Sequence, residues 1–213
     1  MEEFDITVYD SPYEMSGDLS SGKIDAAVRG DMPSSVLLPI LKSNLNMKSL
    51  ERVAFMELPN GKIFILAPVG IDEGWSQEQK YDIAVRSAEI AGRIGMGSRI
   101  AIMSGGRCED VGRCRVVDKS IGSARELSRK LTEAGFDAYH SQILIEEAVK
   151  EADIILAPEG ITGNIIFRSL HFIGGLKSLG APLINTDRVF VDTSRSKTDY
   201  RTALALAMKL TEV

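Results

Sequence analysis

The stretch that decides the fold is "ADIILAPEGITGNIIFRSLHFIGG", which spans residues 152–175. Four apolar residues at 154–157 are typical of a buried strand, and the Pro-Glu-Gly sequence at 158–160 ends it. Helical spacing of apolar residues begins at the Thr-Gly-Asn sequence at 162–164. A strand that passes straight into a helix is the repeating unit of a parallel α/β sheet. Small residues at the start of this helix allow a ligand to approach the backbone amides closely.

Strand and helix patterns alternate on both sides of this stretch. Ser76 and Gln79 resemble a capping box at the start of a long helix. Two apolar runs flank Asn60-Gly61, the strongest short signal for an antiparallel hairpin. The sequence "GGLKSLG" at 174–180 is expected to be a helix exit and turn. Besides the strand and helix quoted above, the predicted strands cover residues 5–10, 23–31, 52–58, 62–68, 98–106 and 182–194, and the predicted helices cover residues 32–46, 75–96, 122–135, 143–152 and 199–210.

This alternation predicts an α/β fold with a three-layer, mostly parallel sheet and right-handed crossovers, interrupted by at least one antiparallel pair, the hairpin. We expect residues 1–213 to form one unit. The pattern is also compatible with two lobes and a cleft between them. One lobe would comprise residues 1–70 plus 181–213, and the other would comprise residues 71–180.

Composition sets limits on function. The chain has 213 residues, a net charge of −5 and no Lys/Arg-rich block, which argues against nucleic acid as a partner. No apolar run approaches the length that crosses a bilayer, so no membrane partner is expected. Met1 is followed by Glu2 and Glu3 without an apolar segment, which argues against a secretory signal and favours a cytoplasmic location.

The cysteines and histidines do not predict a metal site. Cys108 and Cys114 lie six residues apart in "GGRCEDVGRC", and we expect them to be reduced thiols. His140 and His171 occur far from them in sequence and in unrelated contexts. A metal site would need more ligands than this pattern supplies.

Four predicted strand ends carry small and hydroxyl residues, and three of them add an arginine. Ligands of open α/β sheets bind beyond the carboxyl ends of the strands, and arginine can hold a phosphate with two hydrogen bonds. Taken singly, such residues are ordinary turn and cap residues, but four similar ends in one chain favour an anion site. The candidate ligand-binding residues are Arg29, Ser34, Ser35, Ser104, Arg107, Glu159, Thr162, Gly163 and Asn164, and the fourth end adds Ser194 and Arg195.

We predict that Arg29, Arg107, Asn164 and Arg195 converge on one negatively charged ligand. The sequence contains no Walker loop, no G-x-G-x-x-G after the first strand and no G-x-S-x-G elbow. No cofactor is therefore assigned from these patterns. A phosphorylated small molecule is the ligand class that the candidate residues favour.

Four segments together resemble the phosphate acetyl/butyryl transferase family and the related PlsX-like phosphate acyltransferases of phospholipid synthesis. The amino-acid sequences of these segments most resemble those of methanogen MtxX-like proteins, which are described as methyltransferase-associated subunits or methanogenesis marker proteins. The segments occur in the family order and cover most of the chain. They are "GKIDAAVRGDMPSS" at 22–35, the block at 63–104, "ADIILAPEGITGNIIFRSL" at 152–170 and "VDTSRSKTDYRTALALA" at 191–207.

The resemblance implies a phosphotransacetylase-like fold of the isocitrate/isopropylmalate dehydrogenase type, with acyl-CoA and phosphate as substrates and a homodimer as the assembly. Gly163 and Asn164 match a Gly-Asn pair that faces the ligand. Ser194 and Arg195 match a catalytic Ser-Arg pair, and Asp199 stands two residues closer to it than the catalytic aspartate of the family. The resemblance also implies that the chain is shorter than the transferases, chiefly at the N-terminus.

Departures from the family pattern leave the activity open. Asp31 places a negative charge near Arg29, where it could either form a structural ion pair or reject phosphate. Three functions are compatible with the sequence. The protein could transfer an acyl group between a thioester and phosphate, serve as a non-catalytic or methyltransferase-associated subunit of archaeal methanogenesis, or act as a methyltransferase itself.

Overall fold

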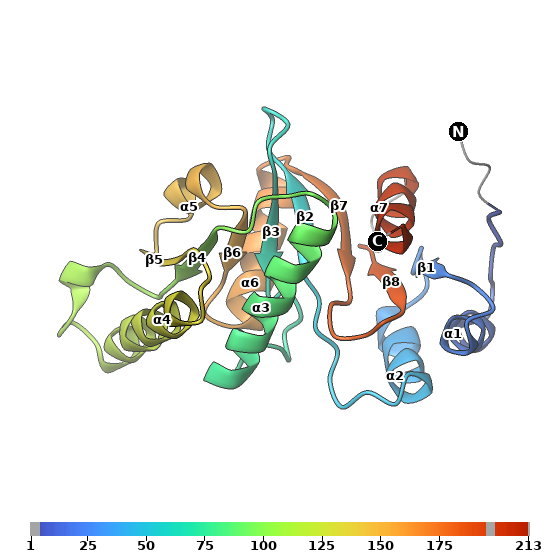
Figure 1. Ribbon diagram of the computed structural model, residues 1–213, viewed down its shortest axis with the longest axis horizontal. Coiled ribbons are helices and arrows are strands. Elements are labelled where there is room, and N and C mark those ends of the chain that lie inside the picture. The colour runs from blue at the N-terminus through green and yellow to red at the C-terminus, as the bar shows by residue number, and fades with distance from the viewer. Residues whose placement is uncertain (1–4, 195–198, 213) are drawn as a thin grey trace.

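The computed structural model describes residues 5–194 and 199–212. Strands and helices alternate through most of this range (Figure 1). The strands are β1 (Ala26–Val28), β2 (Ala54–Glu57), β3 (Ile63–Ala67), β4 (Ile100–Met103), β5 (Ala138–Gln142), β6 (Ile154–Leu156), β7 (Lys177–Pro182) and β8 (Val189–Asp192). The helices are α1 (Pro12–Ser21), α2 (Ser34–Asn44), α3 (Gln77–Arg93), α4 (Arg115–Glu133), α5 (Ile145–Glu151), α6 (Gly160–Arg168) and α7 (Arg201–Thr211), with a 3₁₀ turn η1 (Cys108–Asp110) and a π-helical turn η2 (Ser169–Ile173).

The strands form one eight-stranded mixed sheet in the order β1-β8-β7-β2-β3-β6-β4-β5. β3, β6, β4 and β5 are parallel to one another, and β1 is parallel to β8. β7 is antiparallel to both of its neighbours. The predicted hairpin is confirmed, because β2 and β3 pair antiparallel and Gly61, in the turn between them, has a positive φ of 85°. The α/β fold class is therefore correct, and the pairings of β7 add to the antiparallel part that the hairpin begins.

Helices cover both faces of the sheet (Figure 1). On one face, α3, α4 and α7 pack against the strand residues that point to that side of the sheet, and together they form one large hydrophobic cluster. On the other face, α5 and α6 cover the central strands, and α1 and α2 cover β1 and β8. The two clusters on this second face are separate, which leaves a part of the sheet between α6 and α2 without a hydrophobic cover. No helix in the described ranges has the length and apolar character that crossing a membrane requires.

Two local predictions are wrong. Residues 5–10 form no regular secondary structure, and Val8 is 86% exposed. An alternating apolar pattern forms a strand only where a neighbouring strand is available for pairing. The first element is instead α1, which begins at Pro12; its N-cap residue Ser11 accepts a hydrogen bond from Glu14 N. The segment 174–180 was expected to be a turn, yet β7 begins within it, because β2 and β8 supply hydrogen-bond partners on both sides.

Candidate functional site

A pocket of about 630 Å³ lies between the two hydrophobic clusters on the second face of the sheet. Its floor includes Ala54 of β2 and Ala181 of β7, whose small side chains leave room above the sheet. α6 and η2 contribute one wall, which includes Phe167 and Phe172. The opposite wall is polar and includes Ser34 at the start of α2. The volume is within the range of roughly 300–1,000 Å³ that small-molecule sites occupy.

Close packing against the loop after β3 requires glycine at two positions of α6. A Cβ at Gly160 would overlap with the carbonyl oxygen of Gly70, and a Cβ at Gly163 would overlap with the carbonyl oxygen of Pro68. In addition, Gly160 N donates a hydrogen bond of 2.9 Å to Glu73 O. The first turn of α6 therefore packs directly against the backbone of this loop, and no larger residue fits at either position.

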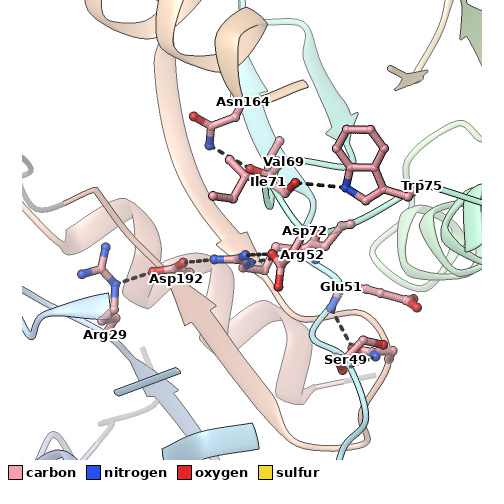
Figure 2. A network of polar contacts seen from close by, with 12 residues as sticks. Arg29, Ser49, Glu51, Arg52, Val69, Ile71, Asp72, Trp75, Asn164 and Asp192 are labelled. Atoms are coloured by element: carbon pink, nitrogen blue, oxygen red, sulfur yellow. Dashed lines mark hydrogen bonds and ion pairs between the residues drawn. The ribbon is translucent and has the colours of Figure 1, made fainter. Parts of the chain in front are cut away.

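Polar side chains at the start of α6 complete this contact. Glu159 is the N-cap residue, and its carboxylate accepts hydrogen bonds from Ile161 N at 2.7 Å and from Thr162 N and Oγ1. Asn164 Nδ2 donates a 2.8 Å hydrogen bond to Val69 O, and Asn164 also lines the pocket (Figure 2). The quoted sequence stretch thus fixes the position of α6 relative to β3 and sets one side of the pocket.

A chain of ion pairs crosses the polar side of the pocket. Asp192, at the end of β8, accepts a hydrogen bond from Arg29 Nε through one oxygen and lies 3.3 Å from Arg52 Nη1 through the other (Figure 2). Arg52 Nε in turn donates to Glu73 Oε1 at 2.8 Å, and Arg52 N donates to Glu73 Oε2 at 2.9 Å. Arg29 Nη1 also donates to Met32 O at 2.6 Å. These contacts connect the ends of β8 and β1, the start of β2 and the loop after β3.

Burial and the ion pairs have opposing effects on the pKa values of these side chains. Burial raises the pKa of the Glu73 carboxyl, and the ion pair with Arg52 opposes that effect only in part. Burial alone would lower the pKa of the Arg52 guanidinium, but the carboxylates of Glu73 and Asp192 outweigh it and raise that pKa. Both arginines thus have carboxylate partners, and the exposed Asp72 lies 3.5 Å from Arg52 Nη2 as a third one. Arg168, at the end of α6, adds a further positive charge to the pocket wall.

Four predicted site residues line the same pocket. They are Arg29, Ser34, Asn164 and Ser194. They come from the ends of β1 and β8 and from the first two turns of α2 and α6, which the sheet order brings together. The carboxylate that pairs with Arg29 is Asp192 rather than the neighbouring Asp31. Arg195 lies outside the described residues.

Other predicted residues do not line this pocket. Ser35 is exposed on α2, and Arg107 is exposed at the start of η1, with its backbone N donating to Asp110 Oδ2 at 2.8 Å. The expected convergence of Arg107 with Arg29 is wrong for this pocket, because β4 lies on the far side of β3 and β6 from the polar wall. Asp199 is half-exposed and pairs with Arg201 at 2.6 Å.

Ser104 is buried and does not line the pocket. It is 1% exposed, and its Oγ lies 2.9 Å from Gly106 O and 2.8 Å from His140 Nε2. Burial, and to a lesser degree the charge of Arg125, lowers the pKa of His140. A catalytic or ligand-binding role for the predicted residues stays a prediction.

Sequence reasoning missed three charged residues of the pocket. Arg52 lies two residues before β2, where no local pattern marks it. Asp192 is the last residue of β8 and belongs to the same predicted strand end as Ser194, but it was not among the predicted site residues. Arg168 had a detectable signal, because it stands four residues after Asn164 and therefore on the same helical face. Among the described residues, no group of three or more His, Cys, Asp or Glu side chains is arranged to hold a metal ion.

Solved structures define the class to which the fold belongs. A branched-chain phosphotransacylase from Enterococcus faecalis superimposes with a TM-score of 0.71 and 23% identity, over 94% of this chain and 78% of that one. A phosphotransacetylase from Streptococcus pyogenes gives a TM-score of 0.73 and 20% identity, over 95% and 68% of the two chains. The chain is thus an α/β protein with the phosphotransacetylase-like fold.

Sequence relatives define the family more narrowly. The protein named "Putative methyltransferase mtx subunit X" in Methanosarcina mazei is 42% identical over 195 residues, which cover 92% of this chain and 70% of that protein. Its namesake in Methanosarcina barkeri is 40% identical over 212 residues, which cover 99% and 78%. The chain belongs to the methanogen mtx subunit X family. No protein-family model matches it.

Proposed function

We propose that the protein binds a phosphate-bearing or CoA-type anion in the pocket between α6 and α2, as a transferase of the phosphate acyltransferase fold. The observation that carries this proposal is that Arg29, Arg52 and Arg168, from three separate segments, line one pocket. Hydroxyl groups of Ser34 and Ser194 line it as well and add hydrogen-bonding capacity for phosphate oxygens.

The proposed reaction is attack of a phosphate oxygen on the carbonyl carbon of a thioester. A C–O bond forms, the C–S bond breaks, and the thiolate leaves and takes up a proton. Arginine side chains would stabilise the negative charge that develops, so positioning and electrostatics would carry the catalysis. By resemblance to the transferases, Ser194 and Arg195 are the residues assigned to the leaving group and to the phosphate. Asp199 is assigned either to orienting Arg195 or to acting as the base.

The alternative function is a methyltransferase-associated subunit that binds the anion without catalysis. The name of the Methanosarcina relatives favours it, since that name describes a subunit of a methyltransferase. The ion pairs of Arg29 and Arg52 also favour it, because two of the three pocket arginines already have carboxylate partners.

One assay distinguishes the two functions. The pure protein is incubated with acetyl-CoA and phosphate, and thiol release is followed with a chromogenic reagent. Acyl transfer predicts release that Arg195→Ala abolishes and that Arg129→Ala, an exposed arginine on α4, leaves unchanged. If no thiol is released above the blank with any short-chain acyl-CoA, the enzyme proposal is wrong. A thermal shift with phosphate, CoA or S-adenosylmethionine then identifies the ligand class.

We also propose that the protein is a homodimer, as its resemblance to the transferases implies. Exposed apolar side chains on α6 and on the loop after β3 support this, among them Ile71, Trp75, Ile161 and Ile165. Light scattering coupled to size exclusion should give twice the 23.2 kDa chain mass. Ile165→Glu should reduce this to the monomer mass, and a wild-type monomer would refute the proposal.

A further inference from the structure

The wall of the pocket opposite the buried ion pairs combines a cation with aromatic rings. The Arg168 guanidinium lies over the Phe172 ring, with its central carbon 5.0 Å from the ring centroid. Phe167 packs edge-on against Phe172, with 6.5 Å between centroids, and all three residues line the pocket. Phe172 nevertheless remains 43% exposed. A large apolar ring that faces a pocket while partly open to water is suited to contact with a ligand.

A π-helical turn produces this arrangement. α6 passes without a break into η2, where Gly174 N donates to Ser169 O, five residues back, at 2.9 Å. His171 Nδ1 then donates to Leu176 O at 2.8 Å, which ties the wider turn to the start of β7. Single π-helical turns are rare in proteins and occur disproportionately at functional sites. This turn carries Phe172 to the pocket wall that Arg168 and Asn164 also line.

The three pocket arginines differ in what they contact. Arg29 and Arg52 are 5% and 15% exposed and bond to Asp192, and Arg52 bonds to Glu73 as well. A ligand anion would have to compete with these carboxylates. Arg168, by contrast, is exposed, and its contact within the described part of the chain is an aromatic ring. A guanidinium stacked on a ring keeps its N–H edges available for hydrogen bonds to an anion.

We infer that Arg168 is the cation that binds the ligand anion, that Arg29 and Arg52 are positioning residues, and that Phe172 selects ligands whose anionic group is joined to a flat aromatic group. This inference rests on the proposed anion-binding function and names the ligand class of the same pocket. The aromatic group stacks on the wall formed by Phe167 and Phe172, above the small side chains of the floor. The anion lies at the Arg168 edge.

Binding of inorganic phosphate tests the role of Arg168. Isothermal titration of the full chain should show affinity falling about tenfold or more in Arg168→Gln, because a charge-assisted hydrogen bond is lost. Arg168→Lys should recover part of the loss, and Arg129→Gln on α4 should bind like the wild type. All these side chains are exposed, so folding is expected to be retained.

A pair of phosphate esters tests the aromatic class. Phenyl phosphate should bind about three- to tenfold more tightly than glycerol 3-phosphate of similar charge, and Phe172→Leu should remove most of that difference. Equal affinity for the two esters would overturn the aromatic selection, and unchanged phosphate affinity in Arg168→Gln would overturn the assignment of Arg168. Either result would leave the anion-binding function in place. Failure of every phosphate compound to bind the wild type would instead reject the proposed function and the inference together.

Discussion

The Asp192 carboxylate and the Arg29 guanidinium form a buried ion pair that joins the adjacent ends of β8 and β1, with the two side chains 12% and 5% exposed. The second carboxylate oxygen lies near Arg52, so one acidic residue orients two pocket arginines. Thr193 N donates to the same carboxylate at 2.8 Å. The polar wall of the pocket therefore depends on a residue that was not among the predicted site residues.

Replacing Asp192 with Asn should destabilise the protein by about 3–5 kcal/mol, because it leaves the buried Arg29 charge without its carboxylate partner. The free energy of unfolding from urea denaturation measures this loss. Glu133→Gln, which breaks an exposed pair with Arg129 on α4, is the matched control and should change little. Equal stability of Asp192→Asn and the wild type would show that the ion pair is not needed for folding.

Gly163→Ala should lower stability by about 1–3 kcal/mol or more, because the added methyl group overlaps with the carbonyl oxygen of Pro68 and forces α6 away from the loop. Gly122→Ala, at an exposed position of α4, is the control. No atom lies within 4 Å of the added Cβ there, so a gain of about 0.5–1 kcal/mol is expected. Thermal unfolding of the two variants should shift in opposite directions, and parallel shifts would contradict the packing argument.

Asn164→Asp should weaken phosphate binding by about tenfold, since it places a negative charge at the pocket and removes the donor to Val69 O. The carboxylate would also face that carbonyl oxygen, so a lower melting temperature is expected. Titration with inorganic phosphate at constant ionic strength measures the effect. Asn164→Ser provides the comparison without the charge; if both variants bind phosphate equally, charge at this position does not influence the ligand.

His140 should make stability depend on pH. Its lowered pKa means that, between the folded-state pKa and about 6.5, the unfolded chain binds more protons than the folded chain. The contribution of His140 is therefore present above about pH 6.5 and is lost as the pH falls through the folded-state pKa. His140→Gln should show a flatter pH dependence of the unfolding free energy between about pH 7.5 and about pH 5. An imidazole that titrates at or above its ordinary value by NMR would refute this.

Several elements were predictable because their signals are local. The Ser76–Gln79 capping box starts α3 as expected, with hydrogen bonds in both directions. Asn60-Gly61 marks the β2–β3 turn, since a positive φ at Gly61 costs little there. Ser11-Pro12 is an equally local start signal, and the sequence interpretation overlooked it in favour of a strand over 5–10. The family was also recognisable, because the order of four segments is retained along the chain.

The remaining features depend on contacts between distant segments. β7 contains Gly180 and Pro182 and shows no strand alternation, and it is a strand because β2 and β8 flank it. Arg107 and Arg29 looked equivalent in sequence, each following a buried strand. The sheet order separates them, because β6 and β3 stand between β4 and the pocket.

The sequence by itself determined the α/β class, the hairpin, the capped start of α3 and the Gly-Asn pair near the start of α6, because each follows from backbone preferences and periodicity within a few residues. Only the tertiary structure decided which charged side chains share the pocket. Arg52, Asp192 and Arg168 are 24 to 140 residues apart in the chain, and an ion pair depends on distance in space rather than on spacing in sequence.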